Sequence, residues 1–98
     1  NIFPIQIEKI LMTFPELASN YLITLSTDND NDNMTVEVEL AEMFTDDYAR
    51  LHSLTKNLTR ALKDEILLTP IVKLVPKGSL PVSEGKAVRV VDKRKVYQ

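Results

Sequence analysis

The chain has 98 residues, of which 44% are hydrophobic and 27% are charged, a balance typical of one small globular domain with a single core. Twelve basic side chains stand against fourteen acidic ones, and the net charge of −2 argues against nucleic acid as a partner, because phosphate binding needs a basic excess. The chain has no cysteine, which excludes disulfides and thiolate metal sites.

The first part of the chain predicts a helix. Pro4 stands where the first turn of a helix tolerates proline, and Pro15 ends the pattern. Between the two prolines, apolar side chains recur at helical spacing, namely Ile7, Ile10, Leu11 and Phe14.

Two alternating segments follow and predict an antiparallel β-hairpin. The inward-facing side chains are expected to be Tyr21, Ile23 and Leu25 on the first strand and Met34, Val36, Val38 and Leu40 on the second. Thr35, Glu37 and Glu39 are expected on the opposite face of the second strand. The segment TDNDNDN, residues 27–33, is rich in residues that tolerate turn geometry.

The second half predicts another helix and two more strands. Thr45 is the expected cap of the helix, with Asp46 and Asp47 placed favourably against its dipole. The apolar stripe of this helix comprises Tyr48, Leu51, Leu54 or Thr55, Leu58, Ala61 and Leu62. Pro70 opens a third strand over residues 71–75, and residues 87–91 predict a fourth.

The resulting order is helix, strand, strand, helix, strand, strand, with a short extended piece at Ile2 and Phe3. Each helix has one apolar stripe and each hairpin strand has one apolar face, so both helices are expected to cover one face of a mostly antiparallel sheet. This predicts an α+β sandwich of ferredoxin-like or ACT-like type. No repeat and no long linker divides the chain, so residues 1–98 are expected to form a single domain.

The sequence shows neither an apolar run of membrane-spanning length nor a secretory signal peptide. We therefore expect a cytoplasmic protein, which the lack of cysteine also fits. Because the chain opens on Asn1 rather than methionine, we expect it to be a fragment or a processed product.

No metal site is predicted. Asp28, Asp30, Asp32 and Glu39 reproduce the carboxylate spacing of an EF-hand calcium loop, but Asn33 replaces the central glycine and strands flank the segment. A solvated hairpin tip is the better interpretation. His52 is the only histidine, and without a second histidine or a cysteine it is expected to be a surface side chain.

Both glycines of the chain lie in the segment GSLPVSEGKAVRV, residues 78–90. Pro81 stiffens the approach, Gly85 allows a tight backbone path, and the strand that follows fixes where Lys86 stands. A long-stemmed ammonium in such a loop can reach a carboxylate or a phosphate in another body. The basic residues from 86 to 95 fit a phosphate-bearing ligand, although a solvated basic end is the more common interpretation.

Two separated motifs give this sequence a resemblance to a known family. The stretch LPVSEGKAVRVVDKR resembles the carboxy-terminal signature of the adenylate-forming enzymes, specifically the phenylacetate–coenzyme A ligase branch, in which Leu-Pro-Arg-Ser-Glu-Gly-Lys ends in the adenylation lysine. The opening NIFPIQIEKIL is similar to the segment that follows the hinge of the same branch, and FPELASNYLI is also similar. The resemblance covers essentially the whole chain.

The resemblance implies a small mobile domain of a much larger ligase. Lys86 would be the catalytic lysine, supported by Pro81, Ser83, Glu84 and Gly85, while Val82 replaces the arginine usual in the branch. Residues Asn1, Ile2 and Phe3 would lie near the hinge and the coenzyme A tunnel. ATP, Mg²⁺, coenzyme A and an aromatic acid would bind mainly to a large N-terminal domain that these residues lack, so this chain alone is expected to be inactive.

Two alternatives stay open at this point. One is a free-standing ACT-like or ferredoxin-like regulatory binding module, because this fold hosts many functions. The other is a related adenylating enzyme whose acyl acceptor is not coenzyme A. The pairing of Gly85 and Lys86 with the Asn-Ile-Phe-Pro segment favours the ligase, since a regulatory module has no reason to carry both.

Overall fold

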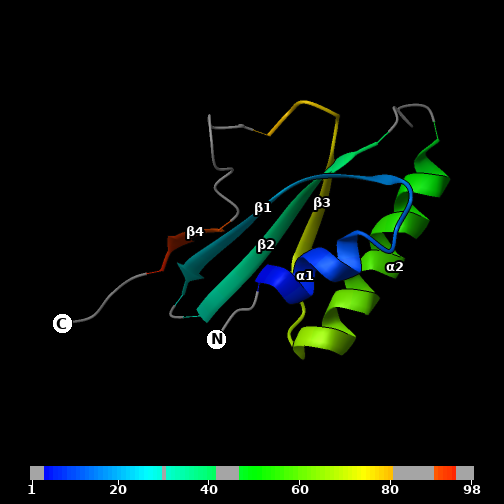
Figure 1. The fold of residues 1–98 in the computed structure, drawn as a ribbon. Coiled ribbons are helices and arrows are strands. Elements are labelled where there is room, and N and C mark those ends of the chain that lie inside the picture. The colour runs from blue at the N-terminus through cyan, green and yellow to red at the C-terminus, as the bar shows by residue number, and fades with distance from the viewer. Residues whose placement is uncertain (1–3, 30, 42–46, 81–89, 95–98) are drawn as a thin grey trace.

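The computed structural model describes residues 4–29, 31–41, 47–80 and 90–94. Its elements follow the predicted order: α1 (Pro4–Leu11), β1 (Leu17–Asp28), β2 (Asn31–Leu40), α2 (Tyr48–Ile66), β3 (Ile71–Val75) and β4 (Val90–Lys93). The four strands form one sheet, and the two helices lie together on one side of it (Figure 1). The α+β sandwich predicted from the sequence is therefore confirmed. The expected extended piece at Ile2 and Phe3 lies outside the described residues.

The central hairpin is confirmed, and it is longer and tighter than predicted. Asp28 pairs with Asn31, so only residues 29 and 30 connect the two strands and most of the expected turn belongs to the strands. Asn29 has φ of 50°, in the left-handed region that asparagine tolerates better than most residues. The strand preference of the alternating segments therefore continues to the tip of the hairpin.

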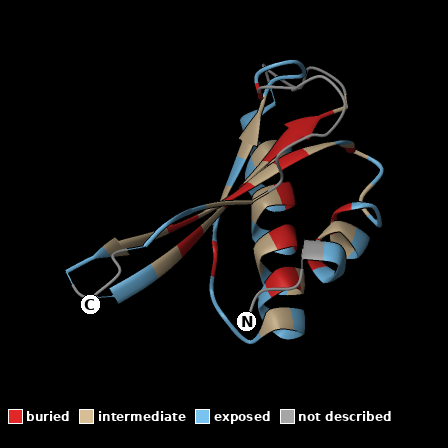
Figure 2. Cartoon of the chain, turned by 60° about the vertical axis from the view of Figure 1, so that its left-hand side comes forward, coloured by how far each residue is buried: buried red, intermediate tan, exposed pale blue. Residues whose placement is uncertain are grey.

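The core lies between the inner face of the sheet and the two helices, as Figure 2 shows. One row of paired side chains crosses all four strands, from Val90 through Ile23 and Val36 to Val72. The helices cover this face with five buried side chains, namely Ile7, Leu11, Leu54, Leu58 and Leu62. The periodicity of the sequence thus identified the buried face of these elements, except that Tyr48, which was counted in the stripe of α2, is 78% exposed.

The pairing of the strands differs from the mostly antiparallel sheet that we expected. The order is β3-β2-β1-β4, with β1 and β2 antiparallel but β3 parallel to β2 and β4 parallel to β1. The reason is that α2 carries the chain back along the sheet after β2, and such a crossover connection joins parallel neighbours. Strands β3 and β4 lie at opposite edges of the sheet and therefore do not pair with each other (Figure 1).

The helix ends also differ from the prediction. Helix α1 ends at Leu11 rather than near Pro15, although Phe14 still packs against the core. The N-cap of α2 is Asp47, whose side chain accepts a hydrogen bond from the backbone N–H of Arg50 at 3.0 Å. The predicted cap Thr45 and its neighbour Asp46 lie outside the described residues, and the helix begins only at Tyr48.

Replacing Asp47 should weaken this helix start. Asp47→Ala removes the acceptor for the Arg50 N–H, and loss of an N-cap typically lowers the free energy of unfolding by about 1 kcal/mol. Urea denaturation of the purified chain measures this difference. Asp47→Asn is the matched control, because asparagine caps equally well, and an equal loss in both variants would show that charge rather than capping matters.

Candidate functional site

The candidate lysine loop is entered through a turn formed by residues 76–79. The backbone N–H of Ser79 donates to the carbonyl oxygen of Pro76 at 3.1 Å. Gly78 occupies the third position of this turn with φ of 85°, the positive value that a type II turn requires there. A Cβ atom at position 78 would meet nothing within 4 Å, so the backbone conformation rather than lack of space demands glycine. This accounts for one of the two glycines of the chain.

A buried carboxylate holds this turn against the sheet. Glu39 is 4% exposed and is the buried charged residue among the described residues. Its Oε1 accepts a hydrogen bond from the backbone N–H of Gly78 at 2.8 Å, and its Oε2 accepts one from the backbone N–H of Leu80 at 2.9 Å. Asn20 donates a third from Nδ2 to Oε2 at 2.8 Å. The end of β2 and the start of the loop are therefore joined through one side chain.

The sequence predicted the face of β2 on which Glu39 lies but did not indicate the burial of its side chain. It alternates with the inward-facing Val38 and Leu40, so it lies on the opposite face of β2, as expected. The alternation does not indicate that residues 78 and 80 cover this side chain. The only signal in the sequence was a carboxylate at the last polar position of a strand, which is too common to indicate an anchor.

Burial by itself raises the pKa of Glu39, but hydrogen bonds from Gly78, Leu80 and Asn20 and the charge of Lys77 outweigh it, so the pKa is lowered overall. Glu39 is therefore a carboxylate at neutral pH and acts as an acceptor for all three donors. Since its pKa in the folded state is below the unfolded value, its contribution to stability is present at neutral pH and is lost as the pH falls through the folded value.

The loop that we predicted to be catalytic lies between two fixed points. Leu80, which is buried, is held by Glu39 of β2, and the amide of Asn20 on β1 also reaches the Leu80 carbonyl oxygen at 3.5 Å. Val90 pairs with Ile23 on β1. Pro81, Ser83, Glu84, Gly85 and Lys86 themselves lie outside the described residues, as do Asn1, Ile2 and Phe3. The roles of these residues stay predictions.

The basic segment after the loop is partly neutralised within the chain. Arg94 donates from Nε to Oδ1 of Asp92 at 3.0 Å and from Nη2 to Oδ2 at 2.7 Å, and this pairing lowers the pKa of Asp92 to about 2. Asp32 at the hairpin tip lies 4.0 Å from Nη1 of Arg94. Strand β4 begins at Val90 and ends at Lys93, whereas residues 87–89 of the predicted strand lie outside the described residues.

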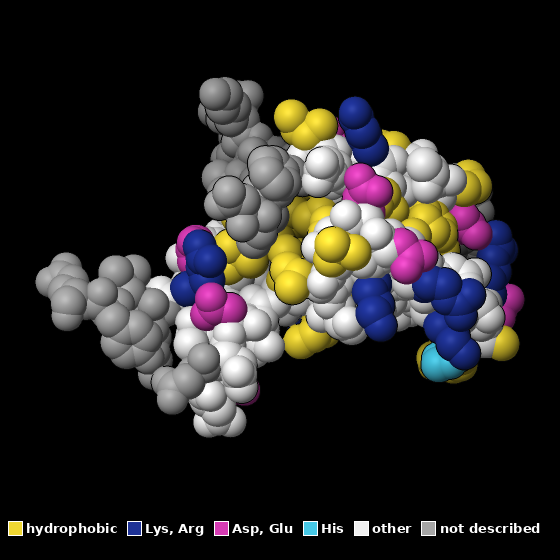
Figure 3. Space-filling model, turned by 90° about the horizontal axis from the view of Figure 1, so that it is seen from below, with side chains coloured by type: hydrophobic (Ala, Val, Ile, Leu, Met, Phe, Trp, Pro, Cys, Tyr) yellow, Lys and Arg dark blue, Asp and Glu magenta, His cyan; other side chains and the backbone are white. Residues whose placement is uncertain are grey.

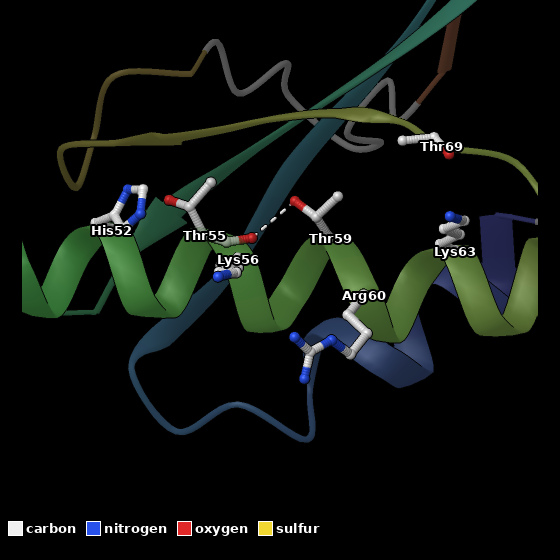
Figure 4. Close-up of a pocket in the computed structure, with 7 residues that line it drawn as sticks. All are labelled: His52, Thr55, Lys56, Thr59, Arg60, Lys63 and Thr69. Carbon is white, nitrogen blue, oxygen red and sulfur yellow. Dashed lines mark hydrogen bonds between the residues drawn. The ribbon is translucent and has the colours of Figure 1, made fainter.

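A separate open hollow of about 640 Å³ lies along α2. His52, Lys56, Arg60 and Lys63 line it together with three threonines (Figure 4). Two of these hydroxyls are already used, because Thr55 donates to the Leu51 carbonyl oxygen and Thr59 to that of Thr55. His52 is exposed, as predicted, and basic side chains gather on the face that Figure 3 shows. The hollow is a basic helix surface without a buried polar group to define a ligand.

The described residues contain neither a membrane-spanning helix nor a cluster of metal ligands. Neither helix of that part of the chain is long and apolar enough to cross a membrane. Within the same residues, no three histidine, cysteine, aspartate or glutamate side chains gather as a metal site would require.

The chain is similar to known proteins over nearly its whole length. Residues 1–94 match the family model described as AMP-binding enzyme C-terminal domain. The phenylacetate-coenzyme A ligases of Thermus thermophilus and Escherichia coli are 34% and 32% identical over 97% and 98% of this chain. The matched part is only 24% and 22% of those relatives, so the chain spans about a quarter of their length.

Two solved structures share the fold. The crystal structure of a domain of phenylacetate-coenzyme A ligase from Bacteroides vulgatus has 66% identity and a TM-score of 0.89, covering 99% of this chain and 89% of that one. A 2-hydroxyisobutyryl-CoA ligase in the thioesterification state has 23% identity and a TM-score of 0.85, covering 97% of this chain and 20% of that one. The second likeness extends the fold to a more distant ligase.

Proposed function

This chain belongs to the family of AMP-binding enzyme C-terminal domains, and we propose that it is the small mobile domain of an aryl or arylacetic acid–coenzyme A ligase. The observation that carries the proposal is the high identity, over nearly the whole chain, to a domain of a phenylacetate-coenzyme A ligase. Because the chain spans only about a quarter of its full-length relatives, its partner would be a large N-terminal domain of the same enzyme. That domain would bind most of the ATP, Mg²⁺, coenzyme A and aromatic acid, in the cytoplasm.

The proposed reaction has two steps. A carboxylate oxygen of the acid bonds to the α-phosphorus of ATP, and pyrophosphate leaves, which gives an acyl-adenylate. The sulfur of coenzyme A then bonds to the acyl carbon, AMP leaves with the electron pair of the broken bond, and the thiol proton is released. The first step brings two anions together, so a positioned cation lowers its barrier most as charge concentrates in the transition state. Lys86 is proposed to supply that cation.

The second step needs a different arrangement of the same domain. Coenzyme A must reach the adenylate, and a lysine loop placed over the α-phosphate would occupy the same region. We therefore propose that the domain rotates between the steps, which withdraws Lys86 and brings Asn1, Ile2 and Phe3 towards the coenzyme A tunnel. Such a change of position between half-reactions is a form of conformational gating.

The two other hypotheses make different predictions. A free-standing regulatory module would need neither the lysine loop nor its anchor, whereas both Lys86 and a carboxylate-held loop entrance are present. An adenylating enzyme with another acceptor would form the adenylate but would not release AMP on addition of coenzyme A. Measuring thioester formation by the complete enzyme distinguishes this case.

The 98-residue chain alone should be folded but catalytically inactive. It has a complete core, and its sequence has no Ser/Thr/Gly-rich phosphate loop to hold ATP. When the purified chain is mixed with ATP, phenylacetate and coenzyme A, pyrophosphate release should not exceed the background without protein. Turnover clearly above that background would contradict the assignment of the ATP and acid sites to another domain.

A further inference from the structure

We infer that Glu39 is a positioning residue for the lysine loop: it fixes the point from which the loop starts, and Asn20 orients its carboxylate. The inference rests on the proposed role of Lys86 in adenylate formation. Two of the three groups that donate to Glu39 are backbone N–H groups of Gly78 and Leu80, immediately before the loop. Lys86 follows Leu80 by six residues.

The core does not explain why a carboxylate occupies this position. The inner face of the sheet and both helices form the core without Glu39, which lies on the other face of β2. A buried carboxylate loses its hydration, so an apolar side chain here would fill the space at a lower desolvation cost. The carboxylate has one property that an apolar side chain lacks, since its two oxygens fix the backbone of residues 78 and 80 in defined positions.

The anchor shortens the connection between the sheet and Lys86. Glu39 belongs to β2 and Asn20 to β1, so Leu80 is tied to the central antiparallel pair of the sheet rather than to its own strand at the edge. Without these bonds the nearest fixed residue before Lys86 is Val75, at the end of β3, and the tether grows from six residues to eleven. A longer tether spreads the ammonium over more positions, and a misplacement of only about 1 Å can cost roughly 100-fold in rate.

The backbone conformation of Gly78 is part of the same anchor. Its φ of 85° turns its N–H, together with that of Leu80, towards one carboxylate. Lys77, beside it, adds a positive charge that favours the ionised state of Glu39. Hydrogen bonds thus join residues 20, 39, 78 and 80 at the place where the chain leaves the sheet.

The variant Glu39→Gln in the complete ligase tests this inference. Glutamine has nearly the same shape, but its NH₂ group cannot accept, so at least one of the two backbone N–H groups loses its partner. We expect acid-dependent pyrophosphate exchange to fall about 10- to 100-fold. Thioester formation from a pre-made acyl-adenylate should change no more than about two-fold, because the lysine has left the site by then.

Glu37→Gln is the matched control. Glu37 lies two residues earlier on the same face of β2, and its side chain makes no hydrogen bond or ion pair among the described residues, so the substitution removes the same charge without touching the anchor. It should leave both half-reactions unchanged. Should Glu39→Gln fail to fold, Glu39→Asp keeps the charge but is one methylene shorter, and the same selective loss is expected.

A second readout does not depend on catalysis. In the 98-residue chain, Glu39→Gln should speed hydrogen exchange at the amides of Gly78 and Leu80 by at least about 10-fold, while amides in the middle of α2 keep their protection. Unchanged exchange at both amides would show that Glu39 does not hold the turn and would overturn the inference.

The outcomes separate the inference from the proposed function. If Lys86→Ala abolishes pyrophosphate exchange and Glu39→Gln leaves it intact, the inference fails and the proposed function stands. If Glu39→Gln reduces both half-reactions equally, Glu39 has a general structural role and the inference also fails. If Lys86→Ala itself spares the exchange reaction, the proposed role of Lys86 fails first.

Discussion

Acid-dependent pyrophosphate exchange by the complete ligase should collapse when Lys86 is replaced by alanine. Removing one preorganised charge-stabilising donor typically costs on the order of 10²–10³ in rate, and a full cation between a carboxylate and a phosphate should cost at least that much. The measurement is incorporation of labelled pyrophosphate into ATP in the presence of the acid. The physical reason is that the ammonium proposed for this role would offset the repulsion between two anions most strongly in the transition state.

Folding should not change in this variant, because a lysine in a loop, as the sequence predicts for Lys86, contributes little to stability. Thermal unfolding of the Lys86→Ala variant and of the unsubstituted enzyme therefore serves as a control. Lys86→Arg is a second control: it keeps the charge but changes its shape and reach, and it should recover only part of the activity. An exchange rate close to that of the unsubstituted enzyme would remove Lys86 from the chemistry.

The second large effect concerns stability. Leu58 is completely buried in the centre of α2, between the other two buried leucines of that helix. Leu58→Ala should lower the free energy of unfolding by about 2–5 kcal/mol, through lost burial and the cavity that is left. For a domain of this size that loss lowers Tm by about 10 °C or more. Urea and thermal denaturation of the 98-residue chain measure it.

Leu67→Ala is the matched control for this prediction. It removes the same atoms from a side chain that is 84% exposed at the end of the same helix. Its backbone N–H, which bonds to the carbonyl oxygen of Lys63, is retained. The control should change stability by less than about 0.5 kcal/mol. A similar loss in both variants would mean that the burial of Leu58 does not determine the effect.

Much of the fold could be predicted because local patterns determine it. Alternation placed Ile23 and Val36 on one face of the hairpin, and they pair directly in the core. Helical spacing placed Leu58 and Leu62 at the centre of the buried stripe of α2. Within each strand and helix, the spacing along the sequence determines which side chains share a face. The sequence alone therefore indicated the buried face.

The direction of the outer strands could not be predicted in this way. The apolar runs of β3 and β4 are short, and nothing in them distinguishes a parallel neighbour from an antiparallel one. Their pairing depends on the path of α2 and of the connection after β3. The anchor at Glu39 was missed for a related reason, because its partners Asn20, Gly78 and Leu80 are 19, 39 and 41 residues away along the chain.

The candidate lysine itself came from a motif rather than from a pattern of burial. Gly85 and Lys86 alone are typical of a solvated turn, and only the second motif at the other end of the chain indicated a ligase. The family match over residues 1–94 confirms the family to which both motifs pointed. What the structure adds is the entrance to the loop, where a hydrogen bond from Gly78 to Glu39 joins the start of the proposed catalytic segment to the sheet.

We propose that Lys86 serves one half-reaction and is absent from the other. The most direct test is the rate of thioester formation from pre-made acyl-adenylate and coenzyme A, measured on the same preparation of Lys86→Ala that has lost pyrophosphate exchange. We expect a rate within about two-fold of the unsubstituted enzyme, since the proposed rotation would carry the lysine away. A loss equal to that of the exchange reaction would contradict it and would give Lys86 a structural role instead.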